Sequence, residues 1–312
     1  MDKPDKSRAD WGNYWQGRTA GQSGEVFGGV GIESSEELSD HWTRCFAGAG
    51  DAVILDLACG AGSAIRHAAA AGCSRLMGLD ISAEALQATR AKLPGLQGLV
   101  ASADRLPLAD DTVDLAVSQF GFEYADRTAA ARDIGRVLRT GGRFCAIVHL
   151  KDGAIAQECA GHLAGLNVIA SSRFIPVAKA VFSAVFAFES SPSDAARQAL
   201  DAALKALTKA QEALMPQVQA GGIAAHLHGG AAQLFERRRN YLEQDIHTWL
   251  DQMSGEIAAY AGRMSGMLNA AIDPGEAQVL LELIAPGGET QCAPFQLGGR
   301  DAALKLTART VA

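Results

Sequence analysis

The sequence predicts an α/β fold in which a doubly wound parallel sheet is covered by helices on both faces. Short apolar segments alternate with helical patterns between residues 53 and 150. Each of the first three apolar segments is accompanied by an acid, namely Asp56, Asp80 and Asp104. Two glycines, Gly60 and Gly62, follow the first segment. Strands that alternate with helices are typical of parallel sheets, because a parallel neighbour needs a crossover connection.

The first strand is expected over residues 53–57, where apolar residues surround Asp56 as in a strand buried on both faces. Gly60 and Gly62 have no Cβ atom, so the chain can turn sharply there and approach a ligand closely. A helix is expected over residues 63–71, ended by Gly72. Its amino end suits a polar or anionic ligand group.

The second strand, residues 76–80, ends at Asp80, twenty residues beyond Gly60. A carboxylate at that distance suits the ribose hydroxyls of a nucleotide. Position 65 is Ile65, where the dinucleotide fingerprint of dehydrogenases has a third glycine. The pattern therefore disfavours a dinucleotide.

The remaining elements continue the alternation. A third strand over residues 97–101 leads to Asp104, and a fourth covers residues 113–118. A helix over residues 127–139 is expected to end in a turn at Gly141 and Gly142, before a fifth strand over residues 143–150.

In this order the elements resemble the class I, Rossmann-like S-adenosylmethionine-dependent methyltransferases of the small-molecule branch. The resemblance covers residues 53–150 and rests on four motifs, which are Asp56-x-x-x-Gly60-x-Gly62, Leu79-Asp80, Ala103-Asp104 with Leu106-Pro107, and Val137-Leu138-Arg139-x-Gly141-Gly142. It implies a mostly parallel seven-stranded sheet with a C-terminal hairpin whose last strand is antiparallel.

The resemblance also implies the cofactor, S-adenosyl-L-methionine, with S-adenosyl-L-homocysteine as product. The methionine part would lie beside Asp56 and the glycines, the ribose at Asp80, and the adenine at Asp104. The cofactor-binding residues that it implies in this chain are Tyr14, Trp15, Arg18, Asp56, Ala58, Gly60, Ala61, Gly62, Asp80, Ile81, Ala103, Asp104, Arg105, Ser118, Gln119 and Phe120.

The resemblance divides the chain into four parts. Residues 1–50 would form an N-terminal helical arm, whose Tyr14, Trp15 and Arg18 either cover the cofactor or pack the arm on the sheet. Residues 51–150 would be the cofactor-binding core, and residues 286–312 the hairpin. Residues 151–285 would be a helical insertion between strands five and six, serving as a substrate lid or as a dimer interface.

The insertion reads as several helices. Two apolar ones are expected over residues 155–170 and 174–188, too short and interrupted for a membrane span. A third would begin at the cap Ser191–Asp194, with Pro192 in the first helical position, and end at Pro216. A fourth would cover residues 232–253 or extend to Tyr260, after a glycine-rich break with His226 and His228. Two histidines without a nearby third ligand do not predict a metal site.

Three residues are candidates for a catalytic base. His149 ends the fifth strand, and its ordinary pKa suits proton transfer near neutrality. Glu123 and Tyr124 follow the fourth strand and would face the same edge of the sheet. Each also has a plain alternative, as a packing histidine or as loop residues.

Composition narrows the function classes. The 312 residues include 28 Lys and Arg against 35 Asp and Glu, a formal net charge of −7, which disfavours nucleic acid as a partner. Six cysteines lack the spacing of zinc or disulfide sites, and the polar N-terminal stretch lacks the apolar region of a signal peptide, so a cytoplasmic location is expected.

The sequence therefore predicts a methyltransferase that acts by in-line displacement on an O, N or C atom of a small apolar or amphipathic molecule. A homodimer through the insertion is an open alternative for that segment. Two other functions stay open, namely a catalytically silent S-adenosylmethionine-binding interaction protein and an NAD-dependent oxidoreductase.

Overall fold

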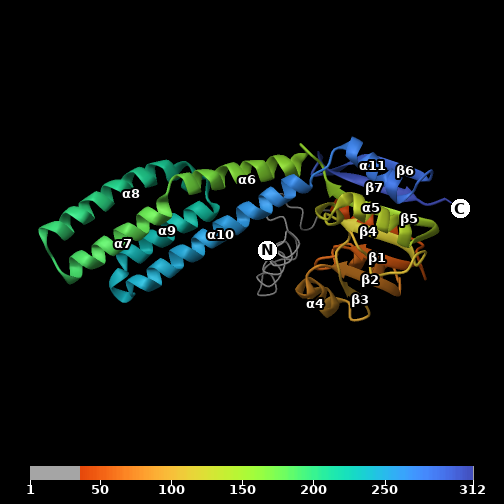
Figure 1. The fold of residues 1–312 in the computed structure, drawn as a ribbon, viewed down its shortest axis with the longest axis horizontal. Helices are drawn as coiled ribbons and strands as arrows, with labels where there is room; N and C mark the ends of the chain where they lie inside the picture. The colour runs from red at the N-terminus through yellow and green to blue at the C-terminus, as the bar shows by residue number, and fades with distance from the viewer. Residues whose placement is uncertain (1–35, 312) are drawn as a thin grey trace. The chain divides into compact units, whose positions relative to one another are not determined.

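A computed structural model describes residues 36–311 (Figure 1). The chain forms two compact units, and each is described separately. The first, the sheet unit, consists of residues 36–158 and 267–311. The second, the helical unit, runs from Cys159 to Gly266.

The sheet unit is built on one seven-stranded sheet with the strand order β3-β2-β1-β4-β5-β7-β6. The strands are β1 (Val53–Leu57), β2 (Arg75–Asp80), β3 (Gln97–Val100), β4 (Val113–Gln119), β5 (Leu138–His149), β6 (Glu289–Leu297) and β7 (Arg300–Arg309). Strands β1 to β5 pair in parallel, whereas β7 is antiparallel to both β5 and β6. This confirms the predicted mostly parallel sheet with a C-terminal hairpin.

Six helical elements of the sheet unit are described, which are α2 (Glu36–Phe46), α3 (Ile65–Ala70), α4 (Ala83–Lys92), η2 (Phe122–Tyr124), α5 (Arg127–Val137) and α11 (Pro274–Ile284). Side-chain oxygens of Ser82, Asp126 and Asp273 accept hydrogen bonds from backbone amides in the first turns of α4, α5 and α11. These N-caps fix where each helix begins.

Side chains of β1 alternate between the two faces of the sheet. Leu55 and Leu57 belong to the main core cluster, where they lie with buried residues of α5 and α11. In the same cluster the rings of Phe122 and Phe144 meet edge to face, with centroids 5.4 Å apart. Because successive strand residues point to opposite faces, Asp56 projects away from this cluster.

The glycine pair after α5 differs from the prediction. Gly141 and Gly142 lie within β5 rather than in a turn before it. The pairing with β4 is irregular here, since Val113 pairs with Leu138 while Leu115 pairs with Arg143. A positive φ of 74° at Gly141 accommodates the extra residues.

The insertion leaves and re-enters the sheet unit at neighbouring points. The backbone N–H of Lys151 donates to the carbonyl of Ile272 at 2.9 Å, and the N–H of Ile272 donates to the carbonyl of His149 at 2.9 Å. The expected end of the insertion, residue 285, differs from the structure. Helix α11 belongs to the sheet unit because Leu280, Leu281 and Ile284 enter the core.

The helical unit consists of long helices. They are α6 (Ala154–Ser171), α7 (Phe174–Ser190), α8 (Asp194–Ala220), α9 (Gly222–Glu236), η3 (Arg238–Asn240) and α10 (Glu243–Ala270), of which α6 and α10 continue into the sheet unit. Polar pairs join them, such as Lys179 with Asp251 at 2.6 Å and Tyr260 with His162 at 2.8 Å.

Three expectations for this unit were wrong. Helix α8 begins at Asp194 rather than at Pro192, and it continues past Pro216 to Ala220, where Gly221 follows with a φ of 91°. The expected break with His226 and His228 is helix α9. The expected fourth helix is divided between α9 and α10, with η3 between them, where Arg238 pairs with Glu189 at 2.6 Å.

The stretch Ala154–Ser190 is long and apolar enough to cross a membrane by length and composition, with 39% of its most apolar window buried. A single stretch of this kind is weak evidence, because core helices pass the same test. Arg173, in the left-handed region at a φ of 56°, separates its two helices α6 and α7.

Close packing of α5 on α11 yields a stability prediction. A Cβ atom at Gly135 would lie 2.6 Å from the carbonyl oxygen of Ile284. We expect Gly135→Ala to lower the free energy of unfolding by about 1–3 kcal/mol, measured by urea denaturation, since backbone must move. The matched control is Gly161→Ala in α6, where a Cβ meets nothing within 4 Å. That change should stabilise by about 0.5–1 kcal/mol, and equal effects of both changes would contradict the packing.

Candidate functional site

The loop after β1 has a backbone that few residues adopt easily. Ala58, Gly60 and Gly62 have φ angles of 51°, 51° and 80°. A Cβ atom at Gly62 would lie 2.8 Å from Cγ2 of Thr89 on α4, and the Thr89 hydroxyl donates to the carbonyl of Gly60 at 2.6 Å. Helix α4 therefore holds the glycine loop in place from the side of β2.

Asp80 ties the ends of β1 and β2 together. Its Oδ2 atom accepts from the backbone N–H of Gly60 at 2.9 Å, and its Oδ1 atom accepts from that of Ser82 at 2.9 Å. Burial raises the pKa of the Asp80 carboxyl, while these amide hydrogen bonds oppose the shift. Each oxygen retains further acceptor capacity, because a carboxylate offers about four acceptor positions.

Asp56 lies deeper in the same site. Its side chain is buried, and its Oδ2 atom accepts from the backbone N–H of Ile65, the first residue of α3, at 3.2 Å. Burial raises the pKa of Asp56 to about 8, and the nearby charge of Asp80 adds to the shift. The site thus contains two buried acids that resist ionisation.

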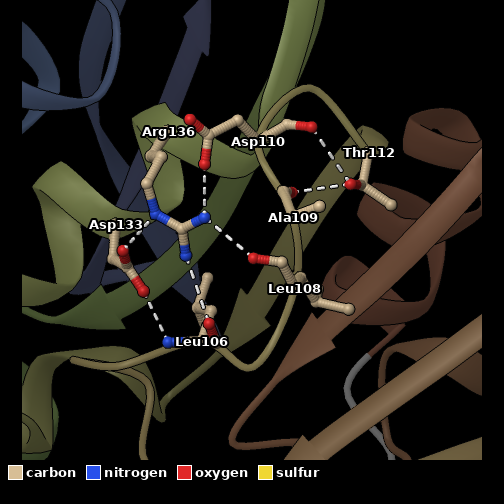
Figure 2. A network of polar contacts seen from close by, with 7 residues as sticks. All are labelled: Leu106, Leu108, Ala109, Asp110, Thr112, Asp133 and Arg136. Carbon is tan, nitrogen blue, oxygen red and sulfur yellow. Dashed lines mark hydrogen bonds and ion pairs between the residues drawn. The ribbon is translucent and has the colours of Figure 1, made fainter.

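The loop after β3 is held by Arg136 of α5 (Figure 2). The Arg136 guanidinium donates to Asp133 at 2.7 Å, to Asp110 at 2.7 Å, and to the carbonyls of Leu106 and Leu108 at 3.1 and 2.8 Å. Asp133 in turn accepts from the backbone N–H of Leu106. The fork geometry of one guanidinium therefore fixes both ends of the segment that follows Asp104 and Arg105.

The end of β4 packs against the end of β1. The Ser118 hydroxyl donates to the carbonyl of Leu57 at 2.9 Å and accepts from the N–H of Phe122 at 3.0 Å. Gln119 accepts from the indole N–H of the buried Trp42 at 2.6 Å. A Cβ atom at Gly121 would lie 2.6 Å from that of Ala58, so the two loops are in direct contact.

The three candidate bases come together beyond β4 and β5. His149 Nδ1 lies 2.8 Å from Glu123 Oε1, and both side chains are buried. The ring of Tyr124 meets that of His149 edge on, with centroids 5.7 Å apart. Phe120 also lies against the imidazole, with ring centroids 4.7 Å apart.

The other predicted residues differ in exposure. Ala61 and Ala103 are buried, Ile81 and Asp104 are half-buried, and Arg105 is exposed. Tyr14, Trp15 and Arg18 lie outside the described residues. For all of them a role at the cofactor stays a prediction.

Sequence reasoning missed the residues that support the loops, namely Trp42, Thr89, Asp133 and Arg136. The spacing of Asp133 and Arg136, three apart on a helix, is a usable signal of an ion pair. Cys59, beside the glycines, is buried, and burial raises the pKa of its thiol well above the ordinary value. A thiol of that kind is a poor nucleophile.

In the part of the chain that the structure describes, no group of three or more His, Cys, Asp or Glu side chains is arranged to hold a metal ion. His228 instead lies 3.5 Å from the side-chain nitrogen of Gln211, and His226 lies against Trp249.

Residues 55–146 match the protein family described as "Methyltransferase domain". This part of the chain is similar to class I methyltransferase domains. S-adenosyl-L-methionine is the cofactor of this class. The match covers the glycine loop, Asp80, the Arg136 network and most of β5, whereas Trp42 and His149 lie outside it.

Curated relatives match the same part of the chain. The ubiquinone/menaquinone biosynthesis C-methyltransferase UbiE of Syntrophotalea carbinolica is 38% identical over 119 residues, which are 36% of this chain and 49% of that protein. An uncharacterised protein of Mycobacterium tuberculosis is 36% identical over 122 residues, 37% of this chain and 41% of that protein. The matches thus cover less than half the length of these relatives.

Among solved structures, an S-adenosylmethionine-dependent methyltransferase from Mesorhizobium loti is 32% identical. The similarity covers 36% of this chain and 54% of that one, with a TM-score of 0.33.

The raised pKa of Asp56 predicts a pH-dependent stability. Between pH 4 and about 8 the folded protein keeps a proton on Asp56 that the unfolded chain has released, so stability falls as pH rises through this window. Asp56→Asn keeps an acceptor for Ile65 and removes the titration. We expect its melting temperature to exceed the wild-type value by a margin that grows from pH 4 to pH 8.

The control for this comparison is Asp51→Asn, at an exposed position. A melting-temperature difference for Asp56→Asn that does not vary with pH would contradict a buried, protonated Asp56.

The Arg136 network predicts local protection of the loop after β3. Arg136→Met removes the donors to two carbonyls and two carboxylates, so amide hydrogen exchange across residues 102–111 should accelerate by about tenfold, a cost of about 1.4 kcal/mol. Arg132→Met, at an exposed position on the same helix, is the control and should leave exchange unchanged. Unchanged exchange in Arg136→Met would show that other contacts hold the loop.

Proposed function

We propose that this protein transfers a methyl group from S-adenosyl-L-methionine to an O, N or C atom of a small molecule. The observation that carries the proposal is the position of Asp80, whose carboxylate bridges the glycine loop after β1 and the start of α4. The methyltransferase domain match over residues 55–146 includes this bridge.

The residues of the site fit the cofactor. Asp80 has acceptor capacity left on both oxygens, which suits the two neighbouring hydroxyls of a ribose. At Gly62 the positive φ and the close contact with Thr89 both require a residue without a Cβ atom, which fixes the shape of the glycine loop. Burial raises the pKa values of Asp56 and Asp80, and a cationic ligand bound beside them would offset that cost by stabilising their ionised forms.

The cofactor supplies a methyl group that is already activated for displacement when it is bound. The protein's own task is to orient the acceptor, to exclude water and to remove a proton where the acceptor carries one. The hydrogen bonds of Arg136 and of the Ser118 hydroxyl help to orient the reactants. Both hold loops at the carboxyl ends of the strands, where open α/β sheets bind ligands.

A small acceptor is supported by the relative from Syntrophotalea carbinolica, which is named a C-methyltransferase of ubiquinone and menaquinone biosynthesis. The apolar character of α6 and α7 supports an apolar or amphipathic acceptor. We further propose a cytoplasmic location, because the six cysteines lack the spacing of disulfide sites. The helical insertion stays predicted as a substrate lid or a homodimer interface.

The cofactor assignment is tested by calorimetric titration with S-adenosylmethionine, S-adenosylhomocysteine and NAD. We expect micromolar binding of the first two, weakened at least about tenfold in Asp80→Asn because one acceptor and the charge are lost. Asp51→Asn, at an exposed position, is the control.

Binding of NAD alone would instead favour an oxidoreductase. Binding of S-adenosylmethionine without turnover of any acceptor in a metabolite panel would favour the silent interaction protein. Unchanged affinity in a folded Asp80→Asn variant would remove Asp80 from the ribose site.

A further inference from the structure

We propose that Glu123 and His149 form one proton-accepting unit, and that the methyl acceptor is a molecule with an acidic hydroxyl, such as a phenol or an enol. The inference rests on the proposed methyl transfer and names the chemistry of its second substrate. It is carried by the geometry of the pair, by its burial and by the balance of protons in the reaction.

The pair is held at the carboxyl ends of two adjacent parallel strands. Glu123 lies in η2, just after β4, and His149 is the last residue of β5. One oxygen, Glu123 Oε1, lies 2.8 Å from the ring Nδ1 of His149 and accepts from its backbone N–H at 3.2 Å. A carboxylate that holds both the backbone and the ring of one residue leaves the imidazole a single orientation.

This contact also selects a tautomer. With Glu123 ionised, Nδ1 carries the hydrogen that is donated to Oε1, so Nε2 is the basic nitrogen of the ring. The rings of Phe120 and Tyr124 both pack against the imidazole and restrict its rotation. Glu123 is therefore a positioning residue, and His149 is the group that receives the proton.

Burial makes a purely structural role for this pair costly. The side chains of His149 and Glu123 are only 2% and 0% exposed. Glu123 Oε2 is buried and has no hydrogen-bond partner among the described residues. Leaving a buried carboxylate oxygen unsatisfied costs free energy, whereas apolar residues of similar volume fill such a position without that cost. The unsatisfied oxygen is thus a place for a donor group of a ligand.

The proton balance indicates the acceptor class. A neutral amine or thioether attacks a methyl group without first losing a proton, so a buried base accelerates its methylation little. A neutral hydroxyl would become an oxonium ion, so its proton must leave as the new bond forms. A phenol, with a pKa of about 10 like that of tyrosine, is close enough in acidity to give its proton to an imidazole.

In the proposed step the acceptor O–H bond breaks and its proton passes to His149 Nε2. The oxygen, or the carbon conjugated with it, forms a bond to the methyl carbon. The bond from that carbon to sulfur breaks, and its electron pair stays on the sulfur of S-adenosylhomocysteine. Glu123 stabilises the imidazolium that results, as a carboxylate does beside a catalytic histidine.

The test compares two matched acceptor probes, 4-butylphenol and 4-butylaniline, which differ in the reacting group. In Glu123→Gln the amide oxygen still accepts from His149, but the charge that stabilises the imidazolium is lost. We expect phenol turnover to fall at least about 100-fold, as for loss of acid–base catalysis, while aniline turnover falls less than about threefold. His149→Gln should lose as much phenol turnover as Glu123→Gln. The double variant should turn over the phenol no more slowly than either single variant, because the two residues act as a unit.

Two further measurements separate this inference from the proposed function and from misfolding. Affinity for S-adenosylhomocysteine, by calorimetry, should stay within about twofold in each variant. Binding of 4-nitrophenol, followed by its phenolate absorbance without any methyl donor, should weaken at least about tenfold in Glu123→Gln. Glu289→Gln, at an exposed position of β6, is the matched control.

Several outcomes would overturn the inference and leave the proposed function intact, provided that the cofactor binds. They are turnover of the aniline but not of the phenol, turnover of neither probe, equal losses on both probes in Glu123→Gln, and full phenol turnover in either single variant. Absence of cofactor binding in the wild type would instead sink the proposed function itself.

Discussion

Parallel pairing of β1 with β2 on one side and with β4 on the other is the constraint on which the candidate site depends. Because these strands run in one direction, their carboxyl ends meet at one edge, and β5 extends that edge beyond β4. Residues that are far apart in the sequence become neighbours there, such as Gly60 with Asp80 and Glu123 with His149.

The edge is polar and buried, so its side chains need support from outside the site. Backbone amides of Gly60, Ser82 and Ile65 serve the two acids, whose pKa values burial raises. Thr89, Arg136 and Trp42 hold the three loops that follow β1, β3 and β4. Loops fixed in this way bind a ligand without losing much further conformational entropy, which is the physical advantage of a preorganised site.

The helical insertion is joined to the sheet unit at two neighbouring points. Its two ends meet in hydrogen bonds between Lys151 and Ile272 and between Ile272 and His149, so the sheet unit is closed without it. The same attachment fixes the backbone of His149. A long insertion joined at neighbouring points costs little in loop closure, since that entropy grows only slowly with length.

The sequence by itself determined in which order strands and helices follow one another along residues 53–150. Apolar periodicity, the glycines Gly60 and Gly62, and the acids near the strand ends all report local conformation. It also predicted the hairpin of β6 and β7, through the resemblance to a known fold. It did not determine that helix α8 passes through Pro216, nor that α11 joins the core, because burial of an apolar face against a distant element outweighs local preference. Only the tertiary structure decided that Glu123 contacts both the backbone N–H and the ring Nδ1 of His149, and that Arg136 holds the loop after β3. Those contacts join residues 26 to 30 positions apart, and the pairing of strands, not the spacing of residues, brings them within hydrogen-bond distance.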